Sequence, residues 1–293
     1  MNIKKVLKVN KKLLFVDIDG TLTLPGENIP PKSALKAIKQ AQENGHKVFL
    51  CTGRNFGMLK PLLKYGFDGV IGCGGGLVQI GDKLIYDYPM TNQQRDLIME
   101  VLKRNGVFRT IESKDMTYGD ENLGEMLKGV GTGNSEIERW RKALSNDLGI
   151  RPMHEYDGRP IYKVVVMCER SEQLNEAREL LEKDFVFAIQ DVAAHNCLNG
   201  DIINRAFDKG QAIQRVCKYL NISILDTIGF GDSMNDLEMI RITGTSVCME
   251  NGSPKLKEIS DVIAPRVEED GLYKVFQKLN LIEGEEGNGI KLS

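Results

Sequence analysis

The sequence is short of the residues that mark secreted, zinc-binding or nucleic-acid-binding proteins. Its 293 residues include six cysteines and three histidines, and no two cysteines form a C-x-x-C pair, which argues against a disulfide or zinc framework. The 39 basic residues nearly balance the 41 acidic ones, so charge gives no reason to expect nucleic acid or an anionic membrane as a partner. No apolar run approaches the length of a membrane span, and the basic N-terminal segment lacks the apolar stretch of a signal peptide. We therefore expect a cytoplasmic protein that binds neither nucleic acid nor membranes.

The chain instead has short apolar segments that alternate with amphipathic ones. Strands are expected over residues 12–18, 46–51 and 69–72, and the segments between them have the apolar spacing of helices. Strands that alternate with helices indicate βαβ units and a parallel sheet. From residue 196 the same alternation resumes with a strand over 197–204. The predicted fold class is α/β, with a Rossmann-like, mostly parallel sheet and helices on both of its faces.

The middle of the chain follows a different pattern. A hairpin is expected over 77–89, followed by helices over 92–105 and 135–148 and by strands that do not alternate regularly with them. The chain length also favours two domains. We therefore predict an α/β core made of residues 1–86 and 196–293, interrupted by an inserted α+β domain at 87–195.

The first strand ends in an acidic motif, Asp17-Ile18-Asp19-Gly20. Residues alternate in direction along a strand, so Asp17 and Asp19 would lie on the same side. Two neighbouring carboxylates repel each other unless a cation or an anion-binding task separates their roles. A calcium-binding EF-hand loop is excluded, because Leu22 stands where that loop requires glycine. The motif is therefore either a turn rich in aspartate and glycine or part of a reactive site.

Three further motifs lie beside predicted strand ends or helix starts. Thr52-Gly53 can cap a helix or hold a phosphoryl oxygen. Lys209 can be a solvated surface charge, or it can pair with carboxylates and a phosphoryl group. Asp232 and Asp236 can cap a helix or help to hold a hard cation such as Mg²⁺. Because ligands of open α/β sheets bind at the carboxyl ends of the strands, the four motifs are expected to meet at one sheet edge.

Taken in order, these motifs resemble the haloacid dehalogenase superfamily of phosphohydrolases. The resemblance covers nearly the whole chain. More narrowly, the sequence resembles the Cof-type branch, type IIB, which carries a large α/β cap. Its markers are "FVDIDGTL", "CTGR", "DKG", "GFGDSMNDLEMI" and "EEDGLYKVF". It implies a hydrolase of phosphoric monoester bonds, with the insertion as its cap. The expected reaction is Mg²⁺-dependent hydrolysis of a small phosphorylated metabolite, a sugar phosphate being one candidate, through an aspartyl-phosphate intermediate.

The resemblance also implies a role for each motif residue. Asp17 would attack phosphorus, and Asp19 would protonate the leaving alcohol and then deprotonate water. Lys209 would neutralise charge near Asp17, which agrees with the need for positive charge when a carboxylate approaches a phosphate dianion. Phosphate binding would fall to Gly20, Thr52, Gly53, Arg54 and Asn235. Mg²⁺ would be held by Asp17, Asp19 (through its backbone carbonyl), Asp232 and Asp236.

The sequence departs from the family at two places. The turn after the third strand is "CGGGLV", residues 73–78, where the family often has Asn-Gly-Ala, and Arg205 stands where a proline is usual. Two other functions stay open. A phosphomutase of the phosphomannomutase type would share a related cap, and a non-catalytic ligand-binding protein would have been expected to lose a carboxylate of the site.

The sequence does not choose among the charged residues of the insertion. The candidates to face the active site are Arg109, His154, Glu155, Arg159 and Lys163. The expected partner is a small phosphorylated metabolite. The protein itself is expected to be a monomer or a weak homo-oligomer.

Overall fold

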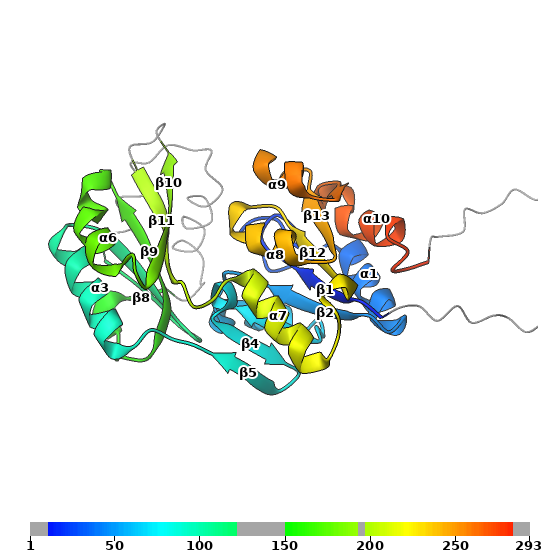
Figure 1. Ribbon diagram of the computed structural model, residues 1–293, viewed down its shortest axis with the longest axis horizontal. Helices are drawn as coiled ribbons and strands as arrows, with labels where there is room; N and C mark the ends of the chain where they lie inside the picture. Colours follow the sequence, from blue (N-terminus) through cyan, green and yellow to red (C-terminus); the bar gives the residue numbers. More distant parts are fainter. Residues whose placement is uncertain (1–10, 122–149, 193–196, 284–293) are drawn as a thin grey trace, which may run out of the picture.

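The computed structural model describes residues 11–121, 150–192 and 197–283, which form two β-sheets with helices packed on them (Figure 1). The larger sheet has eight strands in the order β14-β13-β12-β1-β2-β3-β4-β5. Its strands are β1 (Leu13–Val16), β2 (Lys47–Cys51), β3 (Gly69–Gly72), β4 (Leu77–Ile80), β5 (Lys83–Asp87), β12 (Thr227–Gly231), β13 (Thr245–Met249) and β14 (Val262–Ala264). The strands from β14 to β3 pair in parallel, and β4 and β5 add an antiparallel hairpin at one edge.

Helices cover both faces of this sheet. They are α1 (Lys32–Glu43), α2 (Phe56–Leu63), α7 (Lys209–Leu220), α8 (Leu237–Ile242), α9 (Pro254–Ile259) and α10 (Gly271–Lys278). Successive residues of β1 point to opposite faces: Leu14 and Val16 pack with α1 and α10, whereas Leu13 and Phe15 pack with α7. The predicted fold class, a mostly parallel α/β sheet with helices on both faces, is confirmed.

The local sequence explains where these helices begin and end. Helix α1 buries Ala34, Ala37, Ile38 and Ala41, which recur at helical spacing. The chain leaves α1 through Gly45, whose φ of +89° favours glycine. Helix α7 begins at a cap in which Asp208 accepts a hydrogen bond from the backbone N–H of Gln211.

The smaller sheet has six strands in the order β10-β11-β9-β6-β7-β8. Its strands are β6 (Phe108–Ser113), β7 (Thr117–Gly119), β8 (Ile150–Pro152), β9 (Ile161–Cys168), β10 (Phe185–Val192) and β11 (Cys197–Asn204). Helices α3 (Asn92–Arg104) and α6 (Asn175–Leu181) pack on one face, where Ile98 and Ala177 meet Val164 and Val166. The 3-10 turns of the two parts are η1 (Cys73–Gly75), η2 (Met153–Glu155), η3 (Ser171–Leu174), η4 (Ile224–Asp226), η5 (Met234–Asp236) and η6 (Val267–Glu269).

One strand lies in a different sheet from the one expected. The segment 197–204 was expected to resume the core, but β11 pairs antiparallel with both β9 and β10. Its residues Leu198 and Ile202 pack in the apolar cluster beneath α3 and α6. The apolar pattern of a strand indicates a buried face but does not say which sheet buries it. The parallel sheet therefore resumes at β12.

Other expectations for this region have mixed outcomes. The hairpin over 77–89 is present as β4 and β5, and the helix over 92–105 is present as α3, which begins with a capping box at Thr91. The expected helix over 135–148 lies outside the described residues. Among the helices of the described ranges, none combines the length and the apolar character that a bilayer span requires.

Candidate active site

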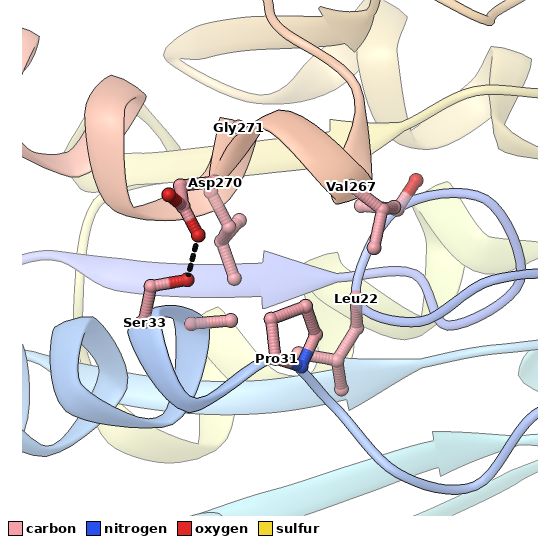
Figure 2. Close-up of a pocket in the computed structure, with 9 residues that line it drawn as sticks. Leu22, Pro31, Ser33, Val267, Asp270 and Gly271 are labelled. Atoms are coloured by element: carbon pink, nitrogen blue, oxygen red, sulfur yellow. Dashed lines mark hydrogen bonds between the residues drawn. The ribbon is translucent and has the colours of Figure 1, made fainter.

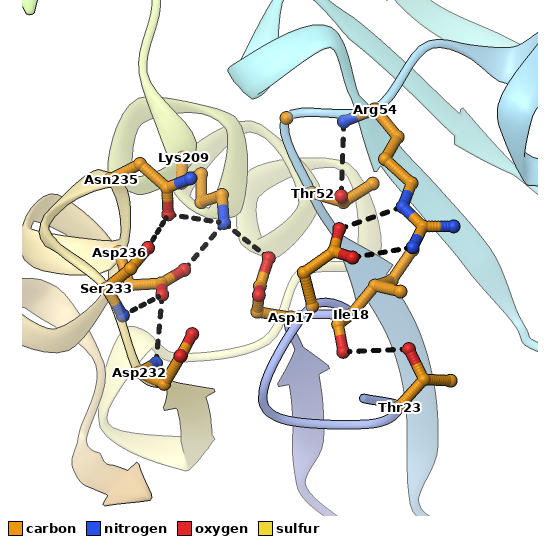
Figure 3. Close-up of polar contacts among 12 residues, drawn as sticks. Asp17, Ile18, Thr23, Thr52, Arg54, Lys209, Asp232, Ser233, Asn235 and Asp236 are labelled. Atoms are coloured by element: carbon orange, nitrogen blue, oxygen red, sulfur yellow. Dashed lines mark hydrogen bonds and ion pairs between the residues drawn. The ribbon is translucent and has the colours of Figure 1, made fainter. Parts of the chain in front are cut away.

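The four motifs meet at one edge of the larger sheet. Asp17 directly follows β1, Thr52 follows β2, and Asp232 follows β12. The parallel register sets Val16 beside Leu50 on one side and Phe230 on the other. The carboxyl ends of these strands therefore lie together, and Lys209 joins them from the first residue of α7 (Figure 3).

Lys209 is the centre of a buried ionic cluster. Its Nζ donates to Asp17 Oδ1 at 2.7 Å and to Asp236 Oδ1 at 2.6 Å. Asn235 Oδ1 lies 3.3 Å from the same nitrogen. Lys209 is 2% exposed and Asp17 4% exposed, while Asp236 is fully buried. Such a cluster is costly to build unless each charge is paired, and here one lysine serves two carboxylates.

Three carboxylates of this cluster could share a cation. One oxygen each from Asp17, Asp232 and Asp236 lies within 4.8 Å of the others. Oδ1 of Asp232 is buried and accepts no hydrogen bond from the part of the chain that the structure describes, which is a costly state for a carboxylate oxygen. Hard cations such as Mg²⁺ prefer oxygen ligands of this kind. The residues therefore fit a divalent cation, and Asp232 has the oxygen most in need of one.

Asp236 is engaged on both of its oxygens. Oδ1 accepts from Lys209, and Oδ2 accepts from the backbone N–H groups of Asp232 and Ser233 at 3.0 and 3.1 Å. These contacts fix the turn that carries Asp232. Asp236 is thus better placed to support the cation site than to supply its main ligand.

Burial and mutual repulsion shift the protonation of the cluster. Burial, followed by the charge of Asp236, raises the pKa of Asp17 to about 7, although Lys209 opposes both. Burial, with the charges of Asp17 and Asp236, raises the pKa of Asp232 to about 9. Burial alone lowers the pKa of Lys209, but Asp17 and Asp236 outweigh it, so that its pKa is raised. Both aspartates therefore gain by taking up a positive charge, whether a proton or a metal ion.

The predicted phosphate-binding residues lie around the same point. Thr52 is buried, and its Oγ1 accepts the backbone N–H of Arg54 at 3.1 Å. Gly20 has a φ of +83°, and a Cβ there would lie 2.3 Å from Asp232 Oδ2. Only glycine lets the backbone come this close to the carboxylate. Asn251 was missed by the sequence reasoning, although its Nδ2 donates to the carbonyl of Gly20 and to Asp232 Oδ2.

Asp19 and Arg54 contact each other. The strand ends at Val16, so strand alternation does not extend to Asp19, and its carboxylate pairs with Arg54, whereas that of Asp17 pairs with Lys209. The guanidinium also donates to Asn28 Oδ1 and to the carbonyl of Glu27, and its contact with phosphate stays a prediction. Asn28 carries no motif signal, so its part in this network could be found only from the fold.

A small recess elsewhere in the core does not belong to this site. Figure 2 shows it between the loop of Leu22, Pro31 and Ser33 and the segment of Val267 and Asp270. Ser33 donates to Asp270 Oδ1 at 2.6 Å across it. Its lining includes none of the clustered carboxylates, so it has no link to their chemistry.

Comparison with known proteins decides the family. Residues 14–276 match the sequence model of the haloacid dehalogenase-like hydrolases. The chain belongs to this family. The resemblance read from the motifs is confirmed, and with it the predicted enzyme class, a hydrolase of the haloacid dehalogenase phosphatase type.

Individual proteins that resemble this haloacid dehalogenase-like hydrolase in sequence or structure are consistent with this family. "Putative phosphatase YkrA" of Bacillus subtilis is 30% identical and covers 94% of this chain and 100% of its own. "5-amino-6-(5-phospho-D-ribitylamino)uracil phosphatase YwtE" of Bacillus subtilis is 26% identical, with 92% and 98% covered. A solved haloacid dehalogenase-like hydrolase from Bacillus subtilis has a TM-score of 0.75 at 23% identity, with 92% and 99% covered. The "HAD Subclass IIB Sugar Phosphatase BT4131" has a TM-score of 0.74 at 20% identity, with 93% and 100% covered. The two structures share the fold of this hydrolase.

The smaller sheet brings one of its five candidate side chains to the site of this hydrolase. Lys163, on β9, is 2% exposed, and its Nζ lies 3.5 Å from the carbonyl oxygen of Gly53. It pairs with Glu112 at 3.2 Å and with Asp201 at 3.5 Å, two residues that the sequence reasoning missed. A Cβ on Gly53 would lie 3.9 Å from Lys163 Nζ and 4.0 Å from Asn235 Nδ2. Lys163 therefore borders the ionic cluster around Lys209.

The other four candidates pair with residues of the smaller part of the molecule. Arg109 pairs with Asp120 and donates to the carbonyl of Met99 on α3. His154 pairs with Glu121, Glu155 with Arg151, and Arg159 with both Asp157 and Asp115. The two sheets are joined near the site by backbone bonds such as Phe56 N–H to the carbonyl of Lys114, at 2.8 Å.

The two departures from the family pattern leave the cluster intact. The "CGGGLV" segment forms η1, in which Gly75 has a φ of +111° and a Cβ would lie 2.3 Å from the carbonyl oxygen of Asp208. This close approach lets η1 pack on the start of α7, next to Lys209. Arg205 instead donates to the carbonyl of Glu182, the residue that directly follows α6.

The raised pKa values of Asp17 and Asp232 predict that the stability of the folded protein depends on pH and on Mg²⁺. In the folded protein the pKa is about 7 for Asp17 and about 9 for Asp232, against 3.8 for an ordinary aspartate. Groups with raised pKa values stabilise the folded state in their protonated form, so their contribution is full below about pH 4 and is lost as pH rises through 7 and then 9. Bound cations need deprotonated carboxylates, so Mg²⁺ should raise the melting temperature more at about pH 8 than at about pH 5. Thermal unfolding with EDTA or MgCl₂ measures both effects.

Two Asp→Asn variants, one at the site and one matched control away from it, test where the effect arises. Asp232→Asn should weaken the pH dependence and the response to Mg²⁺. Asp226→Asn, which removes a partly exposed carboxylate paired with Lys12, should leave both unchanged. Equal responses to Mg²⁺ in the wild type and Asp232→Asn would show that the cation binds elsewhere.

Proposed function

We propose that this hydrolase is a Mg²⁺-dependent phosphatase that hydrolyses a phosphate monoester of a small metabolite through a covalent aspartyl-phosphate. The observation that carries the proposal is the cluster of Asp17, Asp232 and Asp236 around Lys209 at the carboxyl edge of the parallel sheet. The names of its relatives support it, since one is a phosphatase of a phosphorylated ribitylaminouracil and a structural neighbour is a sugar phosphatase. Sugar and polyol phosphates are therefore the first substrates to test.

The reaction would proceed in two steps. In the first, an oxygen of Asp17 bonds to phosphorus, the ester P–O bond breaks, and Asp19 gives a proton to the leaving oxygen. In the second, water bonds to phosphorus, the bond to Asp17 breaks, and Asp19 takes a proton from that water. Splitting a slow hydrolysis in this way suits phosphate monoesters, which are very unreactive without a catalyst.

Charge compensation is the main electrostatic task of the site. A carboxylate and a phosphate dianion repel each other unless positive charge lies between them. Lys209 donates to Asp17 and is held in place by Asp236, so it would supply part of that charge without reorganising. Mg²⁺, held by Asp17, Asp232 and the backbone carbonyl of Asp19, with Asp236 in support, would supply the rest.

The remaining residues would bind the substrate. Thr52, Gly53 and Gly20 would contact the phosphoryl oxygens, and Asn235 would orient the phosphate from the Lys209 side. Lys163, at the border of the cluster, would face the leaving group. Its neighbours Glu112 and Asp201 compensate its charge.

We also propose that the smaller sheet and its helices form a cap over the core. The predicted division assigns residues 1–86 and 196–293 to the core and 87–195 to the cap, and the pairing of β11 in the smaller sheet favours moving the second boundary beyond Asn204. The protein would act as a monomer or a weak homo-oligomer. Four of its described cysteines, Cys51, Cys73, Cys217 and Cys248, are free and buried, which suits the reducing cytoplasm.

The experiment that tests this function is the release of inorganic phosphate from a panel of phosphorylated metabolites. We expect release from at least one sugar or polyol phosphate, with a kcat on the order of 1 s⁻¹ or higher, and loss of that release in EDTA. Restored activity on adding MgCl₂ in excess would support the cation site. Release unchanged by EDTA would contradict the role of Mg²⁺. Isomerisation of a sugar phosphate that needs a bisphosphate activator would identify a phosphomutase instead.

A further inference from the structure

Arg54 has a fixed position beside the proposed phosphate-binding turn. Its side chain is 4% exposed. Its backbone N–H donates to Thr52 Oγ1 at 3.1 Å, and its carbonyl accepts the N–H of Cys73 at 2.9 Å. Both backbone groups of Arg54 are therefore held by hydrogen bonds. Because the backbone is fixed, the fold sets which groups the guanidinium contacts.

The guanidinium holds the carboxylate of Asp19 at two points. Nε of Arg54 donates to Oδ2 at 2.8 Å, and Nη2 donates to Oδ1 at 2.7 Å. A two-point contact between planar groups fixes the orientation of the carboxylate as well as its position, which a lysine cannot do. The backbone N–H of Gly26 adds a third contact, to Oδ1 at 2.7 Å.

The same guanidinium also ties down the loop that follows Asp19. Nη1 donates to Asn28 Oδ1 at 2.6 Å, and Nη2 donates to the carbonyl of Glu27 at 3.0 Å. Arg54 therefore joins the loop from residue 19 to residue 28 to the end of β2. The two aspartates of the first motif thus have separate cationic partners, Lys209 for Asp17 and Arg54 for Asp19.

We infer that Arg54 is a positioning residue that orients the Asp19 carboxylate for proton transfer, an inference that rests on the proposed phosphatase function. Asp19 must reach the ester oxygen in the first step and the attacking water in the second, and general acid–base catalysis requires hydrogen-bond distance in both. A carboxylate that turns freely spends little time in that geometry. Loss of this role in an Arg54 variant should therefore slow the reaction most for esters whose leaving group most needs a proton.

The test compares two esters of similar shape, p-nitrophenyl phosphate and phenyl phosphate. Nitrophenolate leaves without a proton, whereas phenolate leaves better with one. In Arg54→Lys, which keeps the charge but loses the two-point contact, kcat/KM for phenyl phosphate should fall about 10²-fold. For p-nitrophenyl phosphate, kcat/KM should fall less than about tenfold, but kcat should drop because the second step still needs a base. A burst of nitrophenolate before slow turnover would report that second step directly.

Two further variants separate this role from others. Arg241→Lys, at an exposed arginine paired with Glu238, is the matched control and should leave both substrates unchanged. Asn28→Ala removes one contact of the guanidinium but keeps the pair with Asp19. Its kcat/KM should therefore also fall more for phenyl phosphate than for p-nitrophenyl phosphate, but by a smaller factor than in Arg54→Lys.

The other outcomes overturn the inference in distinguishable ways. Equal losses for both esters with a raised KM would mean that Arg54 binds phosphate. Equal losses in proportion to a lowered melting temperature would mean that it only stabilises the fold. A wild type that hydrolyses neither ester, nor any of the metabolite panel, would overturn the phosphatase function itself and the inference with it. An active wild type whose Arg54 variants fail to discriminate would overturn the inference alone.

Discussion

Asp17→Asn is expected to lower phosphatase turnover by about 10⁴-fold or more, because an amide is a poor nucleophile and the covalent step then has no starting point. The loss should appear in kcat and in kcat/KM alike, for good and poor leaving groups. Phosphate release from the best substrate of the panel, under excess MgCl₂, measures it. Asp226→Asn, a surface variant of the same chemistry, should retain the wild-type rate.

The same variant should remain folded. Asp17 is buried, and burial and the charge of Asp236 together disfavour its ionised form. Asparagine has nearly the same shape and carries no charge, so it relieves repulsion with Asp232 and Asp236, while Lys209 keeps its bond to Asp236. The melting temperature in EDTA at about pH 8 should therefore equal or exceed that of the wild type. Near-normal hydrolysis by a folded Asp17→Asn protein would refute the nucleophile assignment.

Lys209→Met has the second large expected effect, and it acts on both activity and stability. Removing the cation leaves Asp17 and Asp236 buried without their partner, and breaking a buried ion pair in this way costs about 3–5 kcal/mol. Turnover should fall about 10³-fold as charge compensation at Asp17 is lost. Urea unfolding in EDTA and phosphate release with MgCl₂ measure the two effects separately.

The pH dependence of this defect has a definite sign. Asp17 already has a raised pKa of about 7 with Lys209 present, and removing the lysine removes a group that lowers it. The defect should therefore be largest above pH 7, where the Asp17 carboxylate of the wild type is charged, and it should shrink at about pH 5, where protonation of Asp17 removes its repulsion with the neighbouring carboxylates. Lys12→Met, at a partly exposed pair with Asp226, should cost about 1 kcal/mol or less. Equal losses in the two variants would contradict a central role for Lys209.

The parts of the site that the sequence predicts are those carried by short local motifs. Asp17, Thr52 and Asp232 each follow a strand whose apolar run is visible in the sequence, and parallel strands end at the same sheet edge. Lys209 was expected in the same place because its motif opens a predicted helix beside a strand end and because the family resemblance implies a role next to Asp17. For these residues, local chemistry and sheet topology point to one arrangement, which is the one observed.

The parts that were missed depend on contacts between distant segments. The side chain of Arg54 meets Asp19 only because β1 and β2 are neighbours. The motif "CTGR" alone does not say whether this arginine binds a phosphate group or a carboxylate. Lys163 could not be selected from its four competitors without the strand register that sets it opposite Glu112. For β11, the alternation showed a buried face, but its partner strands are set by tertiary pairing.

Mass spectrometry of the protein, quenched in acid during turnover of p-nitrophenyl phosphate, tests whether Asp17 forms the covalent bond to phosphorus. We predict that wild-type protein carries one phosphoryl group on the peptide that contains Asp17, that the Asp17→Asn protein carries none, and that EDTA removes the signal. Phosphate release that continues while Asp17 stays unmodified, or a phosphoryl group found on a different residue, would contradict the claim that this buried carboxylate, paired with Lys209, is the group that attacks phosphorus.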